Sequence, residues 1–321
     1  MFSSLYKMEA FKTTLKYIWN SLSLPCCCSV TFTDEMDSIL GNNAAGGQRH
    51  VDPNVLAVLQ DVTEVLEVAP CQESAWAKAF RLTVSIGHHG KLALKGEFES
   101  TSTIHAIVPE FCPKPMGWGT FKNDPNSHFY ICKFYDFIEG VPEPSSFCES
   151  LARLHSSQSP TEGKFGFYCT TYNGNLPQDN TWCDSWEQFF SNGLRHILNI
   201  REERAGPNPE LDALLPQLFD KVIPRLLRPL ESGGRKIKPS LVHGDLWYGN
   251  AGIIDGDTEK GIVYDPASFW AHNEYELGNW RPERNKFTRR YFQAYHSHIP
   301  KAEPEEDYDD RNALYSLYED I

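Results

Sequence analysis

Apolar residues recur along this chain in two rhythms, one typical of helices and one typical of strands. Between residues 53 and 68 they recur at steps of three and four, which predicts an amphipathic helix. Residues 79–86 form a run typical of a strand, and residues 92–108 predict a helix that ends before a proline. The folded part of the chain, which we expect to begin near Asp52, should therefore open with a mixture of strands and helices.

The remaining pattern is mainly helical. A second strand-like run covers residues 129–137, and turn residues follow it at 140–144. Three longer segments then carry apolar residues at helical spacing, and two short apolar runs are typical of strands. The helices are predicted at 145–155, 182–199 and 211–230, and the short strands at 240–242 and 261–264.

The composition narrows the class of protein. The 321 residues are 40% hydrophobic and 23% charged, as in an ordinary soluble globular protein, and the formal net charge is −13. This excess of carboxylates argues against broad electrostatic binding to nucleic acid, and no apolar run is long enough for stable membrane insertion. Nine cysteines without paired spacing indicate neither a disulfide framework nor a zinc site. We therefore expect a reducing compartment, the cytoplasm, and the sequence does not indicate an oligomeric state.

The first 50 residues differ in character from the rest. Residues 17–32 are fairly apolar and follow three lysines, which loosely resembles a mitochondrial targeting segment, and the run Cys26-Cys27-Cys28 could carry a lipid anchor. Glu9 and several polar residues weaken both interpretations, and residues 41–47 have the composition of a flexible linker. We expect residues 1–50 to be a disordered or targeting-like extension.

One short segment carries the candidate chemistry. It runs His-Gly-Asp-Leu-Trp-Tyr-Gly-Asn from His243 to Asn250, and Asp265 follows the next predicted strand. Phosphoryl transfer needs a base that orients the acceptor hydroxyl and oxygen ligands for a metal that bridges the nucleotide phosphates. Asp245 can be this base, and Asn250 has the spacing at which an amide oxygen coordinates Mg²⁺. Asp265 would be the second hard oxygen ligand, and His243 would order the loop by hydrogen bonding.

Several of these residues also have an ordinary structural interpretation. Asp245 and Asn250 could simply be turn formers. Trp247 could be a packing wedge or a platform against which a substrate stacks, and the sequence favours neither. The acidic run at residues 303–310 could bind a metal or a basic partner, but the preferred interpretation is a solvated, poorly ordered connector.

The segment resembles the fructosamine-3-kinase and ketosamine-3-kinase family. The most specific stretches are His243-Gly244-Asp245-Leu246-Trp247-x-Gly249-Asn250 and Tyr264-Asp265-Pro266-Ala267-Ser268-Phe269. Further stretches agree in order over roughly residues 52–318 and include Gly96-Glu97-Phe98-Glu99-Ser100, Phe165-Gly166-Phe167, Pro177-Gln178-x-Asn180-x-Trp182 and Glu274-Tyr275-Glu276-Leu277.

The resemblance implies an α+β, protein-kinase-like fold in two lobes with ATP between them. A small antiparallel sheet would form the N-lobe within residues 51–140, which end in the hinge strand, and residues 141–321 would form a mainly helical C-lobe with the catalytic loop. It also implies an ATP- and Mg²⁺-dependent activity, the phosphorylation of the 3-hydroxyl of a ketosamine. The ketosamine would be a fructosamine or ribulosamine on a glycated protein or a small molecule, and the reaction would be a step of protein repair.

The same resemblance assigns roles by position. Asp245 would be the base, and Asn250 and Asp265 would be the metal ligands. Residues 133–135, which are Lys133, Phe134 and Tyr135, would fall in the hinge that meets the adenine. Glu97 would be the helix glutamate that pairs with the nucleotide-binding lysine, and Trp247 is the candidate substrate contact.

The chain departs from the family pattern at that lysine. The family has a strand lysine about fourteen residues before the helix glutamate, and here this count leads to Thr83. Lys78 is expected on the preceding strand, and Lys91 and Lys95 on the same helix as Glu97. We therefore expect one strand, with its lysine, to be missing. The chain also stops where the family continues with further C-lobe helices.

Three functions remain open from the sequence. The first is a ketosamine 3-kinase. The second is a catalytically impaired pseudokinase that acts as a binding module, because the lysine is missing. The third is a kinase for another small hydroxylated metabolite, such as an aminoglycoside; Trp247 and the run from Asp265 to Phe269 argue against it.

Overall fold

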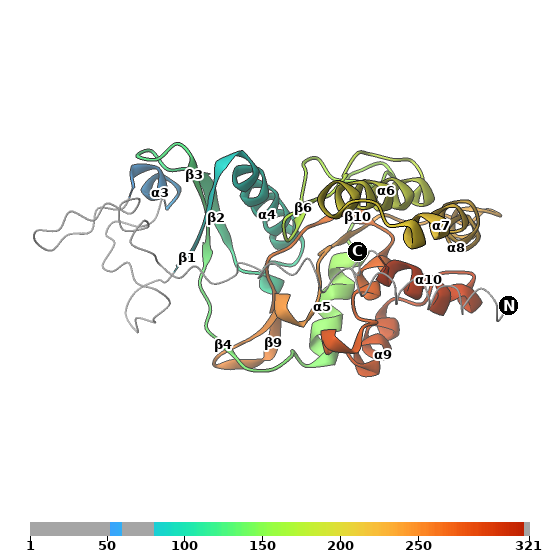
Figure 1. Cartoon of the computed structure of the whole chain (residues 1–321). Coiled ribbons are helices and arrows are strands. Elements are labelled where there is room, and N and C mark those ends of the chain that lie inside the picture. Colours follow the sequence, from blue (N-terminus) through green and yellow to red (C-terminus); the bar gives the residue numbers. More distant parts are fainter. Residues whose placement is uncertain (1–51, 60–79, 318–321) are drawn as a thin grey trace, which may run out of the picture.

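The computed structural model describes residues 52–59 and 80–317, which form a smaller part built on one sheet and a larger, mainly helical part (Figure 1). The strands are β1 (Phe80–Ile86), β2 (Pro115–Thr120), β3 (Ser127–Lys133), β4 (Phe137–Ile138), β5 (Tyr172–Asn173), β6 (Leu176–Pro177), β7 (Ser240–Val242), β8 (Ala251–Ile254), β9 (Asp257–Val263) and β10 (Phe269–Ala271). The helices are α3 (Pro53–Val58), α4 (Gly87–Ile107), α5 (Pro144–Ser156), α6 (Trp186–Ala205), α7 (Pro209–Gln217), α8 (Ile223–Leu227), α9 (Arg289–His298) and α10 (Tyr308–Ser316). Short helical turns lie at Pro109–Phe111, Leu218–Val222, Arg228–Glu231, Tyr248–Asn250, Asn273–Gly278, Glu283–Asn285 and Glu305–Asp307.

The smaller part is an antiparallel sheet in the order β1-β3-β2. One face packs against α3 through a small apolar cluster that includes Val55, Phe121 and Phe129. The opposite face packs against α4, where Leu94 contacts Tyr130 and Cys132. This two-sided packing follows from the alternation of side chains along a strand. Asp52, at the start of the described residues, is buried and caps α3 by accepting from the backbone N–H of Asn54 (2.8 Å).

Strand β1 runs directly into α4. Gly87 has φ +73°, a left-handed conformation that favours glycine, and its N–H donates to Asn126 O (2.7 Å). The prediction that this helix starts at residue 92 was therefore wrong by five residues, because the turn lies at a glycine and the first helical turn carries no apolar stripe. Lys91 and Lys95 lie on α4, as predicted.

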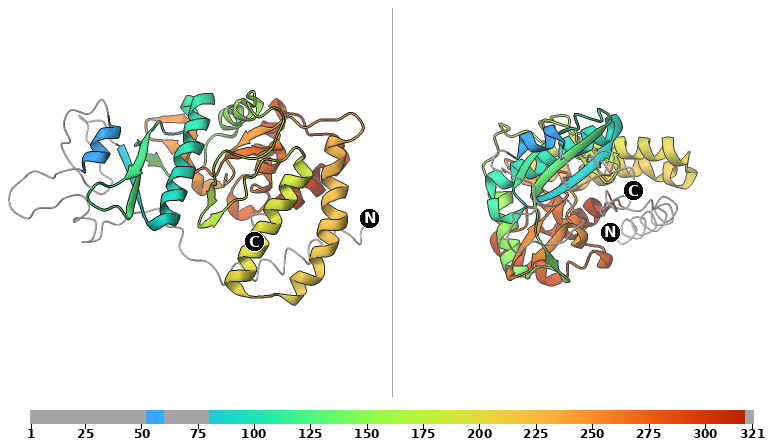
Figure 2. Two further views of the ribbon diagram at one scale, coloured as in Figure 1. Left: turned by 90° about the horizontal axis from the view of Figure 1, so that it is seen from above. Right: turned by 90° about the vertical axis from the view of Figure 1, so that its left-hand side faces the viewer.

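The larger part surrounds one extensive apolar core. Helix α5 packs against α9 and β7, and α6 lies beside α8 (Figure 2). Fully buried aromatic side chains dominate this core, among them Trp186, Trp280, Tyr295 and Tyr315. Burial of such side chains is the main stabilising term for a part of this size.

Two helices differ from the prediction. The segment 211–230 is not one helix but α7, a π-helical turn, α8 and a 3-10 turn. Pro216, Pro224 and Pro229 lack the N–H that a continuous helix requires, which explains the interruptions. Helix α6 begins at Trp186 rather than at residue 182.

The acidic run at residues 303–310 is not the solvated connector that was predicted. It forms a 3-10 turn and the start of α10, and Tyr308 is buried. Asp307 pairs with Arg225 (2.9 Å), and Asp309 pairs with Arg281 (2.8 Å). Specific arginines from other elements therefore order this run, which the local sequence does not reveal.

The proposed boundaries at residues 50 and 140 remain predictions, and residues 1–50 lie outside the described residues. The smaller sheet ends with β3 at Lys133, and the chain then crosses to β4. Among the residues that the structure describes, no helix is long and apolar enough to cross a membrane.

Candidate active site

A tight turn after β7 places Asp245. Gly244 has φ +86°, and a Cβ at this position would lie 2.2 Å from Ala267 O. Only glycine fits here, because the loop must approach the segment that follows Asp265 very closely. The carbonyl of His243 accepts from the N–H of Ala267 (2.9 Å), so the two predicted segments are joined by their backbones.

Asp245 and Asn250 are in direct contact, as the predicted site requires. The Asn250 Nδ2 donates to Asp245 O (2.9 Å) and to Asp245 Oδ2 (3.0 Å). With its nitrogen directed at Asp245, the amide presents its oxygen as the atom that can coordinate a metal. The turn-former interpretation of Asn250 is therefore incomplete, since its side chain also holds the carboxylate.

The carboxyl group of Asp245 is enclosed by protein although the residue as a whole is half-buried. Burial raises the pKa of Asp245 to about 8, with further contributions from the negative charges of Asp265 and Glu276, and the hydrogen bond from Asn250 opposes this rise. Asp265 is thus close enough to affect Asp245 electrostatically. The carboxyl group of Asp245 is consequently more basic than that of an ordinary aspartate.

Asp265 follows β9 and lies at the same end of a hairpin as Asn250. Strand β8 begins directly after Asn250 and pairs with β9, and the N–H of Tyr264 donates to Asn250 O (3.1 Å). Asp265 has φ +56°, a left-handed conformation that few residues other than glycine adopt. The predicted strands at residues 240–242 and 261–264 correspond to β7 and to the end of β9, and the segment lies on a loop after β7. The sequence analysis did not identify β8, and β7 pairs with β10.

This donor set suits Mg²⁺. The Asp265 carboxylate and the Asn250 amide oxygen are hard ligands of the kind that Mg²⁺ prefers. The described ranges contain no group of three or more His, Cys, Asp or Glu side chains that could hold a metal ion. The candidate site is not such a group, because one of its proposed ligands is an asparagine.

His243 orders the loop, in the arrangement that the sequence suggested. Its Nε2 donates to Tyr264 O (3.0 Å), and its Nδ1 accepts from the N–H of Asp245 (3.3 Å). Burial lowers the pKa of His243, so the ring is neutral, consistent with one donating and one accepting nitrogen.

Glu276 is a residue of the site to which sequence reasoning assigned no role. Its carboxylate accepts from the backbone N–H groups of His243 (2.5 Å) and Gly244 (3.1 Å). His155 Nε2 lies 3.5 Å from the same carboxylate, and His155 Nδ1 contacts the Tyr295 hydroxyl (2.7 Å). The sequence offered one signal for Glu276, which is that a carboxylate stands between Tyr275 and Leu277. A charged residue in apolar surroundings needs specific partners.

The predicted hinge residues lie between β3 and β4. Lys133 ends β3, and its Nζ lies 4.2 Å from the centre of the Tyr135 ring. Phe134 and Tyr135 are half-buried. The carbonyl of Asp136 accepts from the N–H of Asp255 (2.9 Å), which ties this segment to the turn of the β8–β9 hairpin.

Glu97 lies on α4, and this helix contacts the catalytic segments directly. Ser100 Oγ accepts from the N–H of Ser268 (3.1 Å). Burial mainly raises the pKa of Tyr130, and the charge of Glu97 contributes, which places Glu97 near the face of the sheet that α4 covers. Helix α4 and the segment around Ser268, which are far apart in the sequence, therefore lie together on the side of the sheet that α4 covers.

The expected lysine is absent from β1. Its seven residues are Phe-Arg-Leu-Thr-Val-Ser-Ile, and Lys78 lies outside the described residues. Thr83 pairs with Tyr130 across the sheet. Paired residues of antiparallel strands share a face, so Thr83 faces α4 and the side on which Glu97 lies. Counting back about fourteen residues from Glu97 thus leads to Thr83, whose side chain faces the expected side of the sheet but carries no charge.

Trp247 is half-buried, and its ring meets that of Tyr248 edge to face, with centroids 4.9 Å apart. It also covers Gly249, where a Cβ would lie 2.4 Å from the indole. These contacts are those of a packing residue, and the substrate role stays a prediction.

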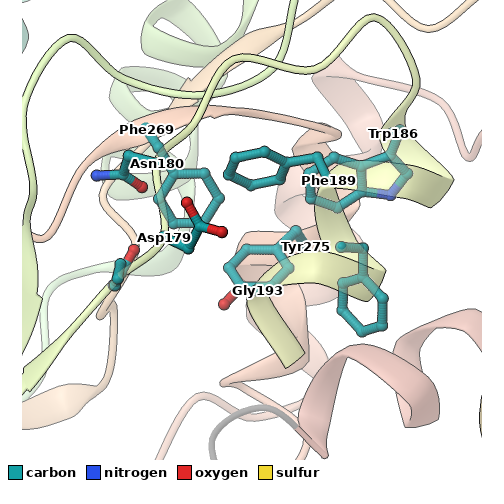
Figure 3. A pocket seen from close by; sticks show the side chains of 9 residues that line it. Asp179, Asn180, Trp186, Phe189, Gly193, Phe269 and Tyr275 are labelled. Carbon is teal, nitrogen blue, oxygen red and sulfur yellow. The ribbon is translucent and has the colours of Figure 1, made fainter. Parts of the chain in front are cut away.

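A small cavity borders the core near this site but is too small for a substrate. Its volume is about 10 Å³, and Asn180, Phe269 and Tyr275 line it (Figure 3). This is space for about one water molecule. Asn180 belongs to the predicted family stretch, and its Nδ2 donates to Thr171 Oγ1 (2.7 Å), so its role here is structural.

Known proteins resemble this chain in sequence. Mouse (Mus musculus) ketosamine-3-kinase is 36% identical over 156 residues, which cover 48% of this chain and 46% of the relative. A chloroplastic protein-ribulosamine 3-kinase from rice (Oryza sativa subsp. indica) is 31% identical over 235 residues, which cover 72% of this chain and 63% of the relative. The chain thus spans from about half to under two thirds of the length of these curated relatives.

Solved structures share the fold. A structure from Haemophilus somnus 129PT described as a fructosamine-3-kinase has a TM-score of 0.61 and 23% identity, with 75% of this chain and 74% of that chain covered. An aminoglycoside phosphotransferase, APH(4)-Ia, in a complex with AMP-PNP and hygromycin B has a TM-score of 0.52 and 13% identity, with 82% and 87% covered. These likenesses confirm the protein-kinase-like α+β fold. The family model described as fructosamine kinase matches residues 78–321, and the chain therefore belongs to the fructosamine kinase family.

Proposed function

We propose that this chain transfers a phosphoryl group from ATP to the 3-hydroxyl of a ketosamine, a fructosamine or ribulosamine carried by a glycated protein or a small molecule. The observation that carries the proposal is the contact between Asp245 and Asn250 with Asp265 beside them. The printed names of the relatives, ketosamine-3-kinase and protein-ribulosamine 3-kinase, support the substrate class. Protein repair in the cytoplasm is the corresponding cellular role.

Each residue has a distinct task in this proposal. Asp245 accepts the proton of the acceptor hydroxyl. Asn250 keeps that carboxylate in place, and Glu276 fixes the backbone of the loop on which it stands. Asn250 and Asp265 would hold Mg²⁺, and the bound ion would neutralise charge on the transferring phosphoryl group. Residues 133–135 contact the adenine, and Trp247 borders the acceptor sugar.

A second candidate rests on β1. This strand has no lysine, enters α4 without a connecting loop, and carries Thr83 at the position where the family pattern has its lysine. One electrostatic donor of this kind contributes about 3 kcal/mol of transition-state stabilisation. The alternative is therefore a pseudokinase that binds nucleotide or ketosamine with little or no turnover.

One assay separates the two candidates. ATP-dependent phosphate transfer to fructosyl-lysine and ribulosyl-lysine is measured for the wild type and for Asp245→Asn, a substitution of nearly equal size. For a kinase we expect Asp245→Asn to lower kcat by about 10³-fold, the usual contribution of a positioned base, with an unchanged melting temperature. Equal rates for the two proteins would overturn the kinase proposal, and nucleotide binding without turnover would then identify the binding module.

A further inference from the structure

A second pocket lies on the helical part and has no residue in common with the site around Asp245. Its volume is about 460 Å³, within the range of small-molecule pockets. It lies between α9 and the start of α10, next to each other in Figure 1, and Arg281 and Lys301 complete its wall. The other lining residues are Arg289, Phe292, Gln293, His296, Tyr308, Asp309 and Asn312.

The residues that α9 contributes to the pocket form a regular stripe along the helix. Arg289, Phe292, Gln293 and His296 occupy positions i, i+3, i+4 and i+7, which share one face of a helix. Tyr291 and Tyr295 lie on another face and are buried in the core. One side of α9 therefore anchors the helix, and the other side lines the pocket.

The lining is strongly basic in an acidic protein. Among the lining residues that the structure describes, three permanent cations, Arg281, Arg289 and Lys301, face one carboxylate, Asp309, whereas the whole chain carries a net charge of −13. Asp309 pairs with Arg281 (2.8 Å). Within residues 52–59 and 80–317, no ion pair involves Arg289 or Lys301. Two positive charges in the pocket are thus available to a ligand.

The uncharged walls hold the pocket in shape. The Tyr308 hydroxyl contacts His296 Nε2 (2.7 Å), and His296 Nδ1 contacts Ile299 O (3.0 Å). The Nζ of Lys301 lies 4.3 Å from the centre of the Tyr308 ring. These contacts link α9, α10 and the segment between them, so the cations stand on an ordered frame, which reduces the entropy lost on binding.

We propose that this pocket binds a small molecule through a phosphate group. A phosphate monoester carries about −1.5 to −2 charges at neutral pH, which matches the two available cations. The guanidinium of Arg289 can donate two parallel hydrogen bonds to phosphate oxygens, and Lys301 adds a point charge. Phe292 and Tyr308 offer apolar surface to the remainder of the ligand.

The test measures binding of inorganic phosphate by isothermal titration calorimetry with the full chain at constant ionic strength. The double variant Arg289→Gln/Lys301→Gln should bind phosphate at least tenfold more weakly than the wild type. Arg290→Gln is the matched control, because it removes the same charge from the neighbouring residue, which does not line the pocket. It should bind phosphate within about twofold of the wild type.

A third variant tests the sign of the electrostatic argument. Asp309→Asn removes the one carboxylate of the lining and should tighten phosphate binding. The proposal is overturned if the wild type shows no saturable binding up to about 10 mM phosphate, or if the double variant and Arg290→Gln bind equally well. Because the readout is binding and not turnover, its outcome is independent of the ketosamine kinase assay.

Discussion

Helix α4 packs against β1 and also contacts the segment that follows Asp265. The proposed catalytic loop and β1 differ in how many of the groups expected for phosphoryl transfer they carry. On the side of the loop, Asp245 is held by Asn250, by the backbone pairing with Ala267, and by Glu276 beneath the turn. On the side of the sheet, β1 keeps its full register with β3 but presents Thr83 where the family pattern has a lysine. Strand β1 therefore pairs fully through its backbone although it carries no lysine.

This difference teaches that fold and catalytic competence depend on different parts of the chain. A strand needs only backbone groups and alternating side chains to pair, and Leu82 and Val84 supply the apolar face. Phosphate neutralisation needs one particular cation in one orientation. The sheet can therefore form without it, and the following predictions probe each side separately.

The largest effect is expected at Glu276. In Glu276→Ala the N–H groups of His243 and Gly244 lose their charged acceptor inside the protein, which should cost about 3 kcal/mol of unfolding free energy. Urea unfolding measures this loss. Glu276→Gln, which keeps one acceptor oxygen, should lose about half as much. An unfolding free energy of Glu276→Ala equal to that of the wild type would contradict the role of Glu276 as the support of the catalytic loop.

A lysine placed on β1 should increase the rate of phosphoryl transfer. Thr83 faces α4 and the side on which Glu97 lies, so Thr83→Lys should raise kcat/KM for ketosamine phosphorylation by about 10²-fold, which corresponds to about 2.7 kcal/mol. Steady-state kinetics with varied ATP measure the gain. Thr83→Met is the control, since it adds length without charge and should leave kcat/KM unchanged. A gain of the same size in both variants would show that packing, not charge, limits the rate.

The smallest effect is a pH dependence of stability that arises in the larger core. Burial lowers the pKa of His272 to about 4, and its Nδ1 accepts from the Tyr315 hydroxyl (2.9 Å). The unfolded chain, with a His pKa near 6.5, binds a proton below that pH while the folded chain does not, so stability is full above pH 6.5 and is lost as the pH falls towards 4.

Between pH 6.5 and 5 this loss amounts to about 2 kcal/mol. Urea unfolding at both pH values measures it. His272→Asn, which keeps an acceptor for Tyr315, should be less stable at pH 6.5 but should lose about 2 kcal/mol less than the wild type on going to pH 5. An identical pH dependence in the two proteins would assign the effect to other groups.

Local patterns predicted much of the fold. Strand β1 and helix α5 lie where apolar spacing places them, and the residues of the catalytic segment are brought together as expected. What the patterns missed depends on distant partners. The pairing of β7 with β10 and the ordering of residues 303–310 by Arg225 and Arg281 arise only when separate elements pack together.

The sequence indicated the residues that would carry the chemistry of the site, but not the residue that holds the loop in position. Asp245, Asn250 and Asp265 could be proposed from the sequence because phosphoryl transfer requires these groups at short spacing. Glu276 offered only the weak signal of a charged residue in apolar surroundings, because its main partners are backbone N–H groups, which leave no pattern in the sequence. Positioning residues of this kind become visible only in three dimensions.

The β8–β9 hairpin has a mechanical consequence for any motion between the two parts. Asn250 and Asp265 stand at its open end, and the hydrogen bond from Asp255 to Asp136 attaches the hinge to its turn. If the β1-β3-β2 sheet rotated about residues 133–136, the pivot would therefore lie at the turn of the hairpin, at the end opposite Asn250 and Asp265. The spacing of the two proposed metal ligands, set by β8–β9 pairing, would stay constant during such a rotation.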